Sequence, residues 1–190
     1  SRRATVVLLS LLAATSARAQ ELEPRNYSHA PVGATFVLAS LGKSSGEIRL
    51  DPSLDVHDVE QHLWLASLGF GHVFELAGSQ ARILALLPTA WGHVSGDVGG
   101  SVAQQDLAGL ADPRFKLSIG LLGAPALGVA EFADAPRTTI VGASLMVLPP
   151  LGDYAASRLV NLGSNRWAVK PELGISQPYG AWTIDAYAGV

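Results

Sequence analysis

The sequence predicts an all-β protein, an antiparallel up-and-down transmembrane β-barrel of which this chain holds about seven strands after an N-terminal signal helix. Three observations predict this fold class. Short runs alternate apolar and polar residues with the period of two that is typical of strands. Short and long connections take turns along the chain, as in barrels whose two ends face different compartments. Finally, the N-terminus has the features of a secretory signal.

Residues 1–19 are expected to form a cleaved signal peptide. "SRR" is a basic start, and "ATVVLLSLLAA" is an apolar stretch shorter than the roughly 20 residues that a membrane-spanning helix needs. "SARAQ" then places Ala17 and Ala19 in the arrangement that precedes cleavage after Ala19. A buried N-terminal helix is the alternative, but the agreement of all these features favours the signal. We therefore expect export, with a polar lead at 20–33 and a barrel domain at 34–190.

Within the barrel domain, the fourth, sixth and seventh expected strands alternate most clearly. In "RFKLSIGLL", Phe115 and Leu117 share one face and Lys116 lies on the other. In "RWAVKPELGIS" the pattern contains Pro171, which has no N–H and needs a bulge or an unpaired ladder position. The chain stops at Val190 inside an alternating run, so we expect a piece of a longer barrel. The expected strands are 34–42, 61–75, 80–92, 113–122, 138–148, 166–177 and 182–190.

The connections fall into two groups that assign the two ends of the barrel. "ELAGS" and "QPYGA" are tight and are expected at the periplasmic end, whereas 43–60, 93–112 and 149–165 are long and expected outside. The link between the fourth and fifth strands is the exception, because it is long where a short turn is expected, and a short helix around 125–132 is predicted there. Tryptophans prefer the membrane interface. This map places three of them at the external rim and one at the opposite rim, namely Trp64, Trp91 and Trp167 against Trp182.

The alternation separates a lipid-facing set of residues from a lumen-facing set. The apolar set is expected to face lipid: Trp64, Leu68, Phe70, Leu87, Trp91, Phe115, Leu117, Ile119, Leu145, Trp167, Leu173 and Ile184. Charged residues of the other face are candidates for tuning selectivity in the lumen: Arg82, Arg114, Lys116, Arg166, Lys170, Glu172 and Asp185. Because cations outnumber anions in this set, it predicts a mildly positive wall that favours anions. Alternatively, the same charges pair across strands and stiffen an occluded barrel.

Composition and motifs argue against several other functions. The net charge is −3, so the chain lacks the basic excess of a nucleic-acid-binding protein. There is no cysteine, and the five histidines show no chelating spacing, so neither a metal site nor another cofactor is expected. The nucleophile motif G-x-S-x-G is absent, and we do not expect an enzyme. The acidic cluster Asp51, Asp55, Asp58 and Glu60 lacks calcium-loop spacing and is interpreted as a solvated loop rather than a cation site.

The blocks "DPRFKLS" and "NRWAVKPELG" are the most specific of several that run from about residue 24 to residue 190. Together these blocks resemble the outer-membrane transporter family labelled "MetA-pathway of phenol degradation". The resemblance implies an outer-membrane β-barrel linked by name to the uptake of aromatic compounds, and it supplies no catalytic motif. Family members are longer than this chain, which again implies missing C-terminal strands.

The sequence therefore leaves two functions open. The first is an outer-membrane channel or transporter, in contact with outer-membrane lipid, for phenolic or other small aromatic solutes. The second is a structural or adhesive outer-membrane barrel with an occluded lumen. A soluble lipid-binding sandwich, whose apolar face would be buried against a second sheet, is a weaker third interpretation. An open path through the lumen favours the first function, and a packed network of Arg, Lys, Glu and Asp favours the second.

Overall fold

A computed structural model describes residues 27–48, 56–98, 100–158 and 160–190 of the chain. The expected signal peptide at 1–19 and the first half of the polar lead, 20–26, lie outside the described residues, as do Asp51 and Asp55 of the acidic cluster.

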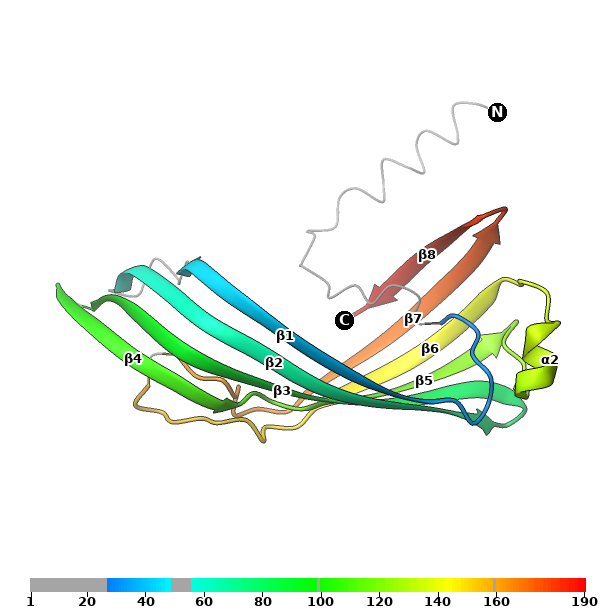
Figure 1. Cartoon of the computed structure of the whole chain (residues 1–190), viewed down its shortest axis with the longest axis horizontal. Helices are drawn as coiled ribbons and strands as arrows, with labels where there is room; N and C mark the ends of the chain where they lie inside the picture. The colour runs from blue at the N-terminus through cyan, green and yellow to red at the C-terminus, as the bar shows by residue number, and fades with distance from the viewer. Residues whose placement is uncertain (1–26, 49–55, 99, 159) are drawn as a thin grey trace, which may run out of the picture.

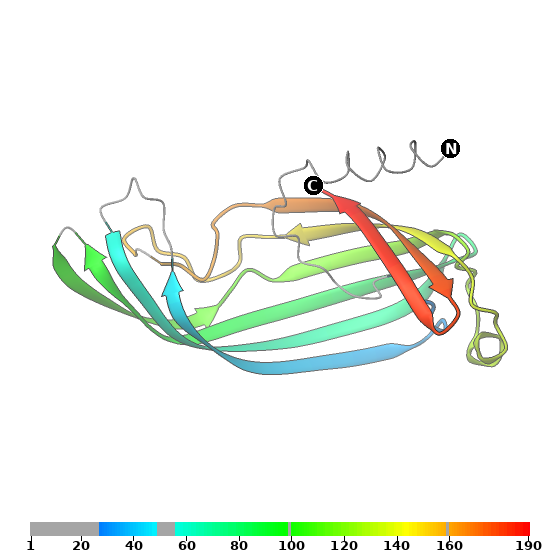
Figure 2. The same cartoon turned by 90° about the horizontal axis from the view of Figure 1, so that it is seen from above.

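The described residues form one curved antiparallel sheet, a half-barrel (Figure 1). Seen from above, the strands run side by side along a trough (Figure 2). The main sheet has the order β1-β2-β3-β5-β6-β7-β8, and β4 pairs with β3 outside this path. Thus seven strands make up the wall, with β1 and β8 as its edges, which confirms the predicted fold class. The strands are β1 (Thr35–Ile48), β2 (Val56–Leu76), β3 (Ser79–Val98), β4 (Ser101–Leu110), β5 (Arg114–Leu122), β6 (Ile140–Leu148), β7 (Ala168–Tyr179) and β8 (Trp182–Gly189).

Short turns join the strands at one end of the sheet. Gly78, with a φ of 78°, lies in the turn between β2 and β3, and Gly180, with a φ of 56°, lies in the turn between β7 and β8. Positive φ is a conformation that glycine adopts without steric cost, so these turns are tight. The predicted short helix is present in the longer β5–β6 connection at this end, as α2 (Val129–Ala133). No helix of the described residues is long and apolar enough to cross a membrane.

At the other end, two of the three expected long loops are mostly strand, so these predictions were wrong. The segment 43–60 contains the end of β1 and the start of β2, and 93–112 contains the end of β3 and all of β4. Asp58 and Glu60 consequently belong to β2, beside a register irregularity. The third expected loop, 149–165, is a connection between β6 and β7. The sheet therefore continues past the ends of β5, β6 and β7 as an extension built from β1, β2, β3 and β4 (Figure 1).

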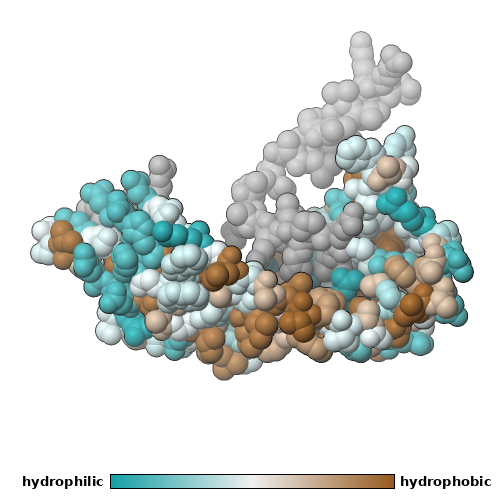
Figure 3. Space-filling view, in the orientation of Figure 1, coloured by the Kyte–Doolittle hydropathy of each residue, from teal (hydrophilic) through white to brown (hydrophobic). Residues whose placement is uncertain are grey.

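The outer face of the half-barrel carries apolar residues in register. Direct partners in adjacent strands share a face, and one such row joins Phe70, Ala85, Phe115 and Val147. Of the residues expected to face lipid, all those within strands fall on this face, and Trp167 lies just before β7. Most residues of this set are exposed, Leu68 and Leu173 among them. Figure 3 shows hydrophobic residues gathered along the lower middle of the view and hydrophilic ones at the left end, where the extension lies.

Two of the tryptophans mark one level of this outer face. Trp64 and Trp91 are register partners on β2 and β3, and their rings stack with centroids 6.5 Å apart. Trp182 begins β8 next to the β7–β8 turn, at the opposite end of the sheet. Trp64 and Trp91 lie within β2 and β3 and not at a strand end as predicted, because both strands continue past them to Val56 and Val98. Trp182 lies beside a turn, as predicted.

Pro171 lies inside β7 and pairs with Leu145 of β6. The β6–β7 register passes through the Leu145–Pro171 pair without a bulge. The Pro171 carbonyl accepts a 3.4 Å hydrogen bond from the Val190 N–H, just past the end of β8. In an extended strand the nitrogen of a residue points to the same side as its carbonyl, so the position without an N–H faces β8 and not β6. The predicted bulge is absent between β6 and β7.

Candidate functional site: the concave face of the half-barrel

Register brings the polar residues of the concave face into rows that cross the sheet. One row joins Arg82, Ser118, Ser144 and Glu172 on four successive strands of the sheet path. The next row contains Lys116 and Lys170, with Met146 between them. Arg114 pairs with Leu86 and Asp185 pairs with Ser176 on the same face. Arg166 differs from the prediction, because it lies in the connection before β7 and is exposed.

Lys116 and Glu172 form an ion pair across β6. The Lys116 Nζ lies 3.7 Å from the Glu172 Oε1, and the two side chains are 5% and 25% exposed. Burying an ammonium group is costly unless an anion and hydrogen-bond acceptors lie close to it. Glu172 therefore compensates the charge of Lys116, and the two together make a polar centre in the concave face. Lys170, by contrast, is exposed.

Tyr27, from the segment that precedes β1, covers this polar centre. Its hydroxyl donates a hydrogen bond to the Glu172 Oε1 at 3.0 Å and lies 3.2 Å from the Ser144 Oγ. Its ring lies against Gly142 and Gly174, where a Cβ atom on either glycine would collide with the ring. The two glycines thus leave a flat site on β6 and β7 that the ring of Tyr27 fills, and Tyr27 is only 5% exposed.

The residues that follow Tyr27 are also bound to the sheet, and we call residues 27–34 the N-terminal strap. The carbonyl of Ser28 accepts hydrogen bonds from the Gln80 Nε2 at 3.3 Å and the Arg82 Nη2 at 3.1 Å. The Ala30 N–H donates to the Gln80 Oε1 at 2.8 Å. Gly33 then donates to the Val73 carbonyl at 2.8 Å. The strap therefore lies along the inner wall and continues into β1.

Sequence reasoning missed the strap because its residues, "YSHAPVGA", show no alternation of apolar and polar side chains and form no strand. The usable signal was in the strands that it covers. Glycine in the interior of a strand often marks a close approach by another group, and Gly142 and Gly174 are such glycines.

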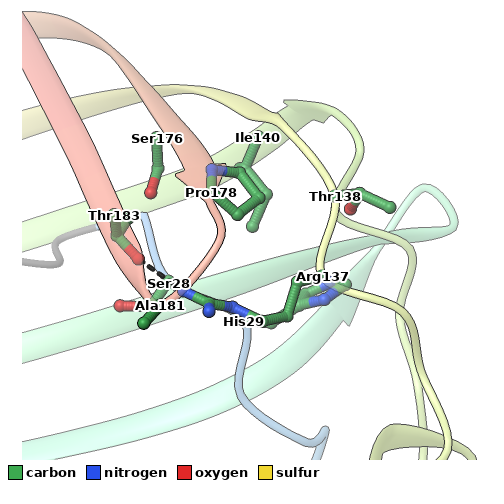
Figure 4. Close-up of a pocket in the computed structure, with 9 residues that line it drawn as sticks. All are labelled: Ser28, His29, Arg137, Thr138, Ile140, Ser176, Pro178, Ala181 and Thr183. Atoms are coloured by element: carbon green, nitrogen blue, oxygen red, sulfur yellow. Dashed lines mark hydrogen bonds between the residues drawn. The ribbon is translucent and has the colours of Figure 1, made fainter.

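A cavity of about 420 Å³ lies beside the strap, near the β7–β8 turn (Figure 4). Arg137 reaches across its edge and donates to the Thr183 Oγ1 at 2.7 Å and to the Gly180 carbonyl at 3.0 Å. His29 of the strap also lines the cavity, and its ring meets Phe132 of α2 edge-on with centroids 6.2 Å apart. Ser28, Ser176 and Thr138 add hydroxyl groups. The cavity lining therefore combines hydrogen-bonding groups with the apolar side chains of Ile140, Pro178 and Ala181, and the cavity belongs to the concave face.

Metal chemistry finds no support in the part of the chain that the structure describes. No group of three or more His, Asp or Glu side chains there is arranged to hold a metal ion. The concave face offers hydroxyls, amides, the Lys116–Glu172 ion pair and the exposed Lys170. Such groups can bind and orient polar solutes, or pair with one another.

The sheet has an apolar outer face and a polar inner face, as the wall of a membrane β-barrel does. The family comparison agrees: the family model described as "Putative MetA-pathway of phenol degradation" matches residues 56–190, and the chain belongs to this family. The fold is similar to that of an outer-membrane channel from Pseudomonas putida F1, with a TM-score of 0.62 and 24% identity over 89% of this chain. The chain spans 59% of the length of that channel. Among curated proteins, no match was found.

Proposed function

We propose that this chain forms part of an outer-membrane β-barrel channel that passes small solutes, phenolic or other small aromatic compounds among them. The observation that carries the proposal is the contrast between the two faces of one sheet. Exposed Leu68, Phe70 and Leu117 lie outside, while Lys116, Ser144 and Glu172 lie inside. An isolated sheet in water has no use for such an exposed apolar face, whereas a membrane barrel requires it.

The solute class rests on the family membership and on the chemistry of the inner wall. The family description refers to phenol degradation. Hydroxyl groups of Ser28, Thr138 and Ser176 line the cavity on the concave face and are suited to a phenol hydroxyl, which both donates and accepts hydrogen bonds. The resemblance to a channel further supports transport rather than catalysis.

The solute class is tested by current block in a planar bilayer that contains the full-length protein. Phenol is expected to interrupt the ionic current in a concentration-dependent way, and cyclohexanol, which has the same hydroxyl on a saturated ring, is expected to do so at least about tenfold more weakly. Equal block by the two alcohols would remove aromatic solutes from the proposal while leaving the channel in place.

The second candidate function, an occluded structural barrel, is favoured by the N-terminal strap. Tyr27 fills the flat site on β6 and β7 and is bound to the ion-paired Glu172. A strap held in this way narrows the lumen. The variant Tyr27→Ala separates the two functions: a channel limited by the strap gains conductance, whereas a barrel occluded by its remaining strands stays closed. Tyr154→Ala, a change of the same kind at an exposed residue of the β6–β7 connection, is the control.

A further inference from the structure

The cavity beside the N-terminal strap contains a cation, Arg137, whose described partners are all uncharged. Its Nη1 donates to the Gly180 carbonyl, and its Nη2 donates to the Thr183 Oγ1 and, at 3.4 Å, to the Trp182 carbonyl. Among the residues that the structure describes, Arg137 has no ion-pair partner. A guanidinium carries five N–H donors, so donors remain for a further acceptor while the β7–β8 turn holds the group in place.

Hydroxyl groups from two neighbouring strands face the same cavity. Ser176 of β7 is only 7% exposed, and Figure 4 shows its hydroxyl pointing toward Thr183 of β8. The Arg137 guanidinium reaches this point from the other side, where it donates to the Thr183 Oγ1 at 2.7 Å (Figure 4). A fixed cation and hydroxyl donors therefore converge on one space. A carboxylate oxygen accepts strong, charge-assisted hydrogen bonds from such groups.

The rest of the lining suits an uncharged, apolar part of a ligand. Ile140 is buried, and it lines the cavity together with Pro178 and Ala181. No Asp or Glu occurs among the described residues that line the cavity, and Asp185, the register partner of Ser176, is not one of them. A bound anion thus meets one positive charge and no negative charge within this lining.

We propose that this cavity binds small organic carboxylates at the end of the barrel that carries the short turns. The single guanidinium charge matches a single carboxylate, and the volume of about 420 Å³ falls in the range of small-molecule pockets. Charge and hydrogen bonding define this ligand class, so an aromatic ring is not required. The inference rests on the proposed function and deepens it, because it adds charged solutes to the uncharged ones that the channel passes.

The proposal is tested by ¹⁹F NMR titration of the full-length protein in lipid nanodiscs. 4-Fluorobenzoate and 4-fluorobenzamide share one ring and differ in charge, while 4,4-difluorocyclohexanecarboxylate keeps the charge without an aromatic ring. Empty nanodiscs correct for partition into lipid. Arg137→Gln removes the cation, and Ser176→Ala removes a hydroxyl without disturbing the β7–β8 turn. Arg158→Gln is the matched control, since Arg158 is an exposed arginine of the β6–β7 connection and does not line this cavity.

Saturable binding of both carboxylates is expected, with 4-fluorobenzamide at least about tenfold weaker than 4-fluorobenzoate. Arg137→Gln should weaken carboxylate binding at least about tenfold and Ser176→Ala about fivefold, whereas Arg158→Gln should leave it unchanged. Equal binding of the acid and the amide would overturn the proposal. So would unchanged binding in both cavity variants, or an equal loss in Arg158→Gln.

This test and the test of the channel fail separately. A protein that conducts ions but binds the acid and the amide equally refutes only the carboxylate site. One that binds carboxylates through Arg137 but never conducts refutes only the channel.

Discussion

The Lys116 Nζ and the Glu172 Oε1 lie 3.7 Å apart on strands that are not neighbours, with β6 between them. Tyr27 adds a third polar group to this pair by donating to the same Glu172 oxygen. Three segments far apart in the sequence thus meet at one carboxylate: the strap, β5 and β7. This carboxylate connects the stability of the wall to the position of the strap, and several predictions depend on it.

Changing one partner of the ion pair is expected to cost more than changing both. Glu172→Gln removes the anion 3.7 Å from the buried Lys116 ammonium, and Lys116→Met removes the cation beside the Glu172 carboxylate. In a double-mutant cycle of unfolding free energies, the coupling between the two changes is expected to be about 1 kcal/mol or more. Denaturant unfolding in lipid vesicles provides the four free energies. Strict additivity of the single changes would show that the pair contributes nothing.

An arginine on the apolar outer face is expected to destabilise the barrel in lipid. Ile119 has Ala81 and Ala143 as its register partners on this face. Ile119→Arg should cost about 2–4 kcal/mol if this level lies near the membrane midplane. Gln104→Arg, on the extension beyond the Trp64–Trp91 pair, is the control and should cost less than about 1 kcal/mol. Heat-resistant migration and folding yield report the difference, and equal behaviour of the two variants contradicts the facing assignment.

Acid is expected to loosen the β6–β7 connection through Asp112. Desolvation by burial tends to raise the pKa of Asp112, but hydrogen bonds from Ser164, Gly152 and Leu151 outweigh it and hold this pKa below its usual value. A lowered folded-state pKa contributes stability that is present above the unfolded value of about 3.9 and is lost as pH falls through the folded value. The unchanged protein should therefore exceed Asp112→Asn in stability by about 1 kcal/mol at neutral pH, since partial exposure screens the charge.

The pH series for this pair of proteins runs from neutral pH to below 3, with protease resistance of residues 149–167 as the readout. The advantage of the unchanged protein should disappear at the acidic end, where both side chains are neutral. An advantage that persists unchanged to the lowest pH would show that the charge of Asp112 is not what holds the connection.

Lys170 is expected to carry the anion preference that the charged concave face predicts. Lys116 is compensated by Glu172, whereas Lys170 is exposed on the same face. In a salt gradient, the reversal potential of the unchanged protein should indicate anion preference, and Lys170→Glu should shift it toward cations. Lys43→Glu on the outer face of β1 is the control and should shift it little. Cation preference of the unchanged protein, or no shift of the reversal potential for Lys170→Glu, would show that Lys170 does not determine the ion selectivity.

The clearest strands could be predicted from the sequence because each has one apolar face throughout. Phe115, Leu117 and Ile119 point outward along β5, and Leu173 and Ile184 do so on β7 and β8. The extension could not be predicted in this way, because its apolar residues, Val94 and Leu107 among them, face inward. The sequence analysis expected apolar strand residues to face lipid, so it interpreted this segment as loop. The apolar residues face inward here because the β6–β7 connection packs against them.

The candidate site could be predicted only in part from the sequence, for a related reason. Alternation alone assigns Lys116, Glu172 and Asp185 to the inner face, since a period of two fixes the side of every strand residue. It cannot show that Lys116 and Glu172 meet across an intervening strand, nor that Tyr27 joins them from 117 residues before Ser144. Arg166 was assigned to a face by extending β7 beyond its true start at Ala168.

Single-channel recording of the full-length protein in a planar bilayer tests the central claim most directly. Discrete current steps are expected for the unchanged protein, and larger steps for Tyr27→Ala, because removal of the ring takes the strap away from Glu172 and widens the lumen. Tyr154→Ala should give the steps of the unchanged protein. If neither the unchanged protein nor Tyr27→Ala produces current steps although both are folded in the bilayer, the barrel is not a channel and its role is structural.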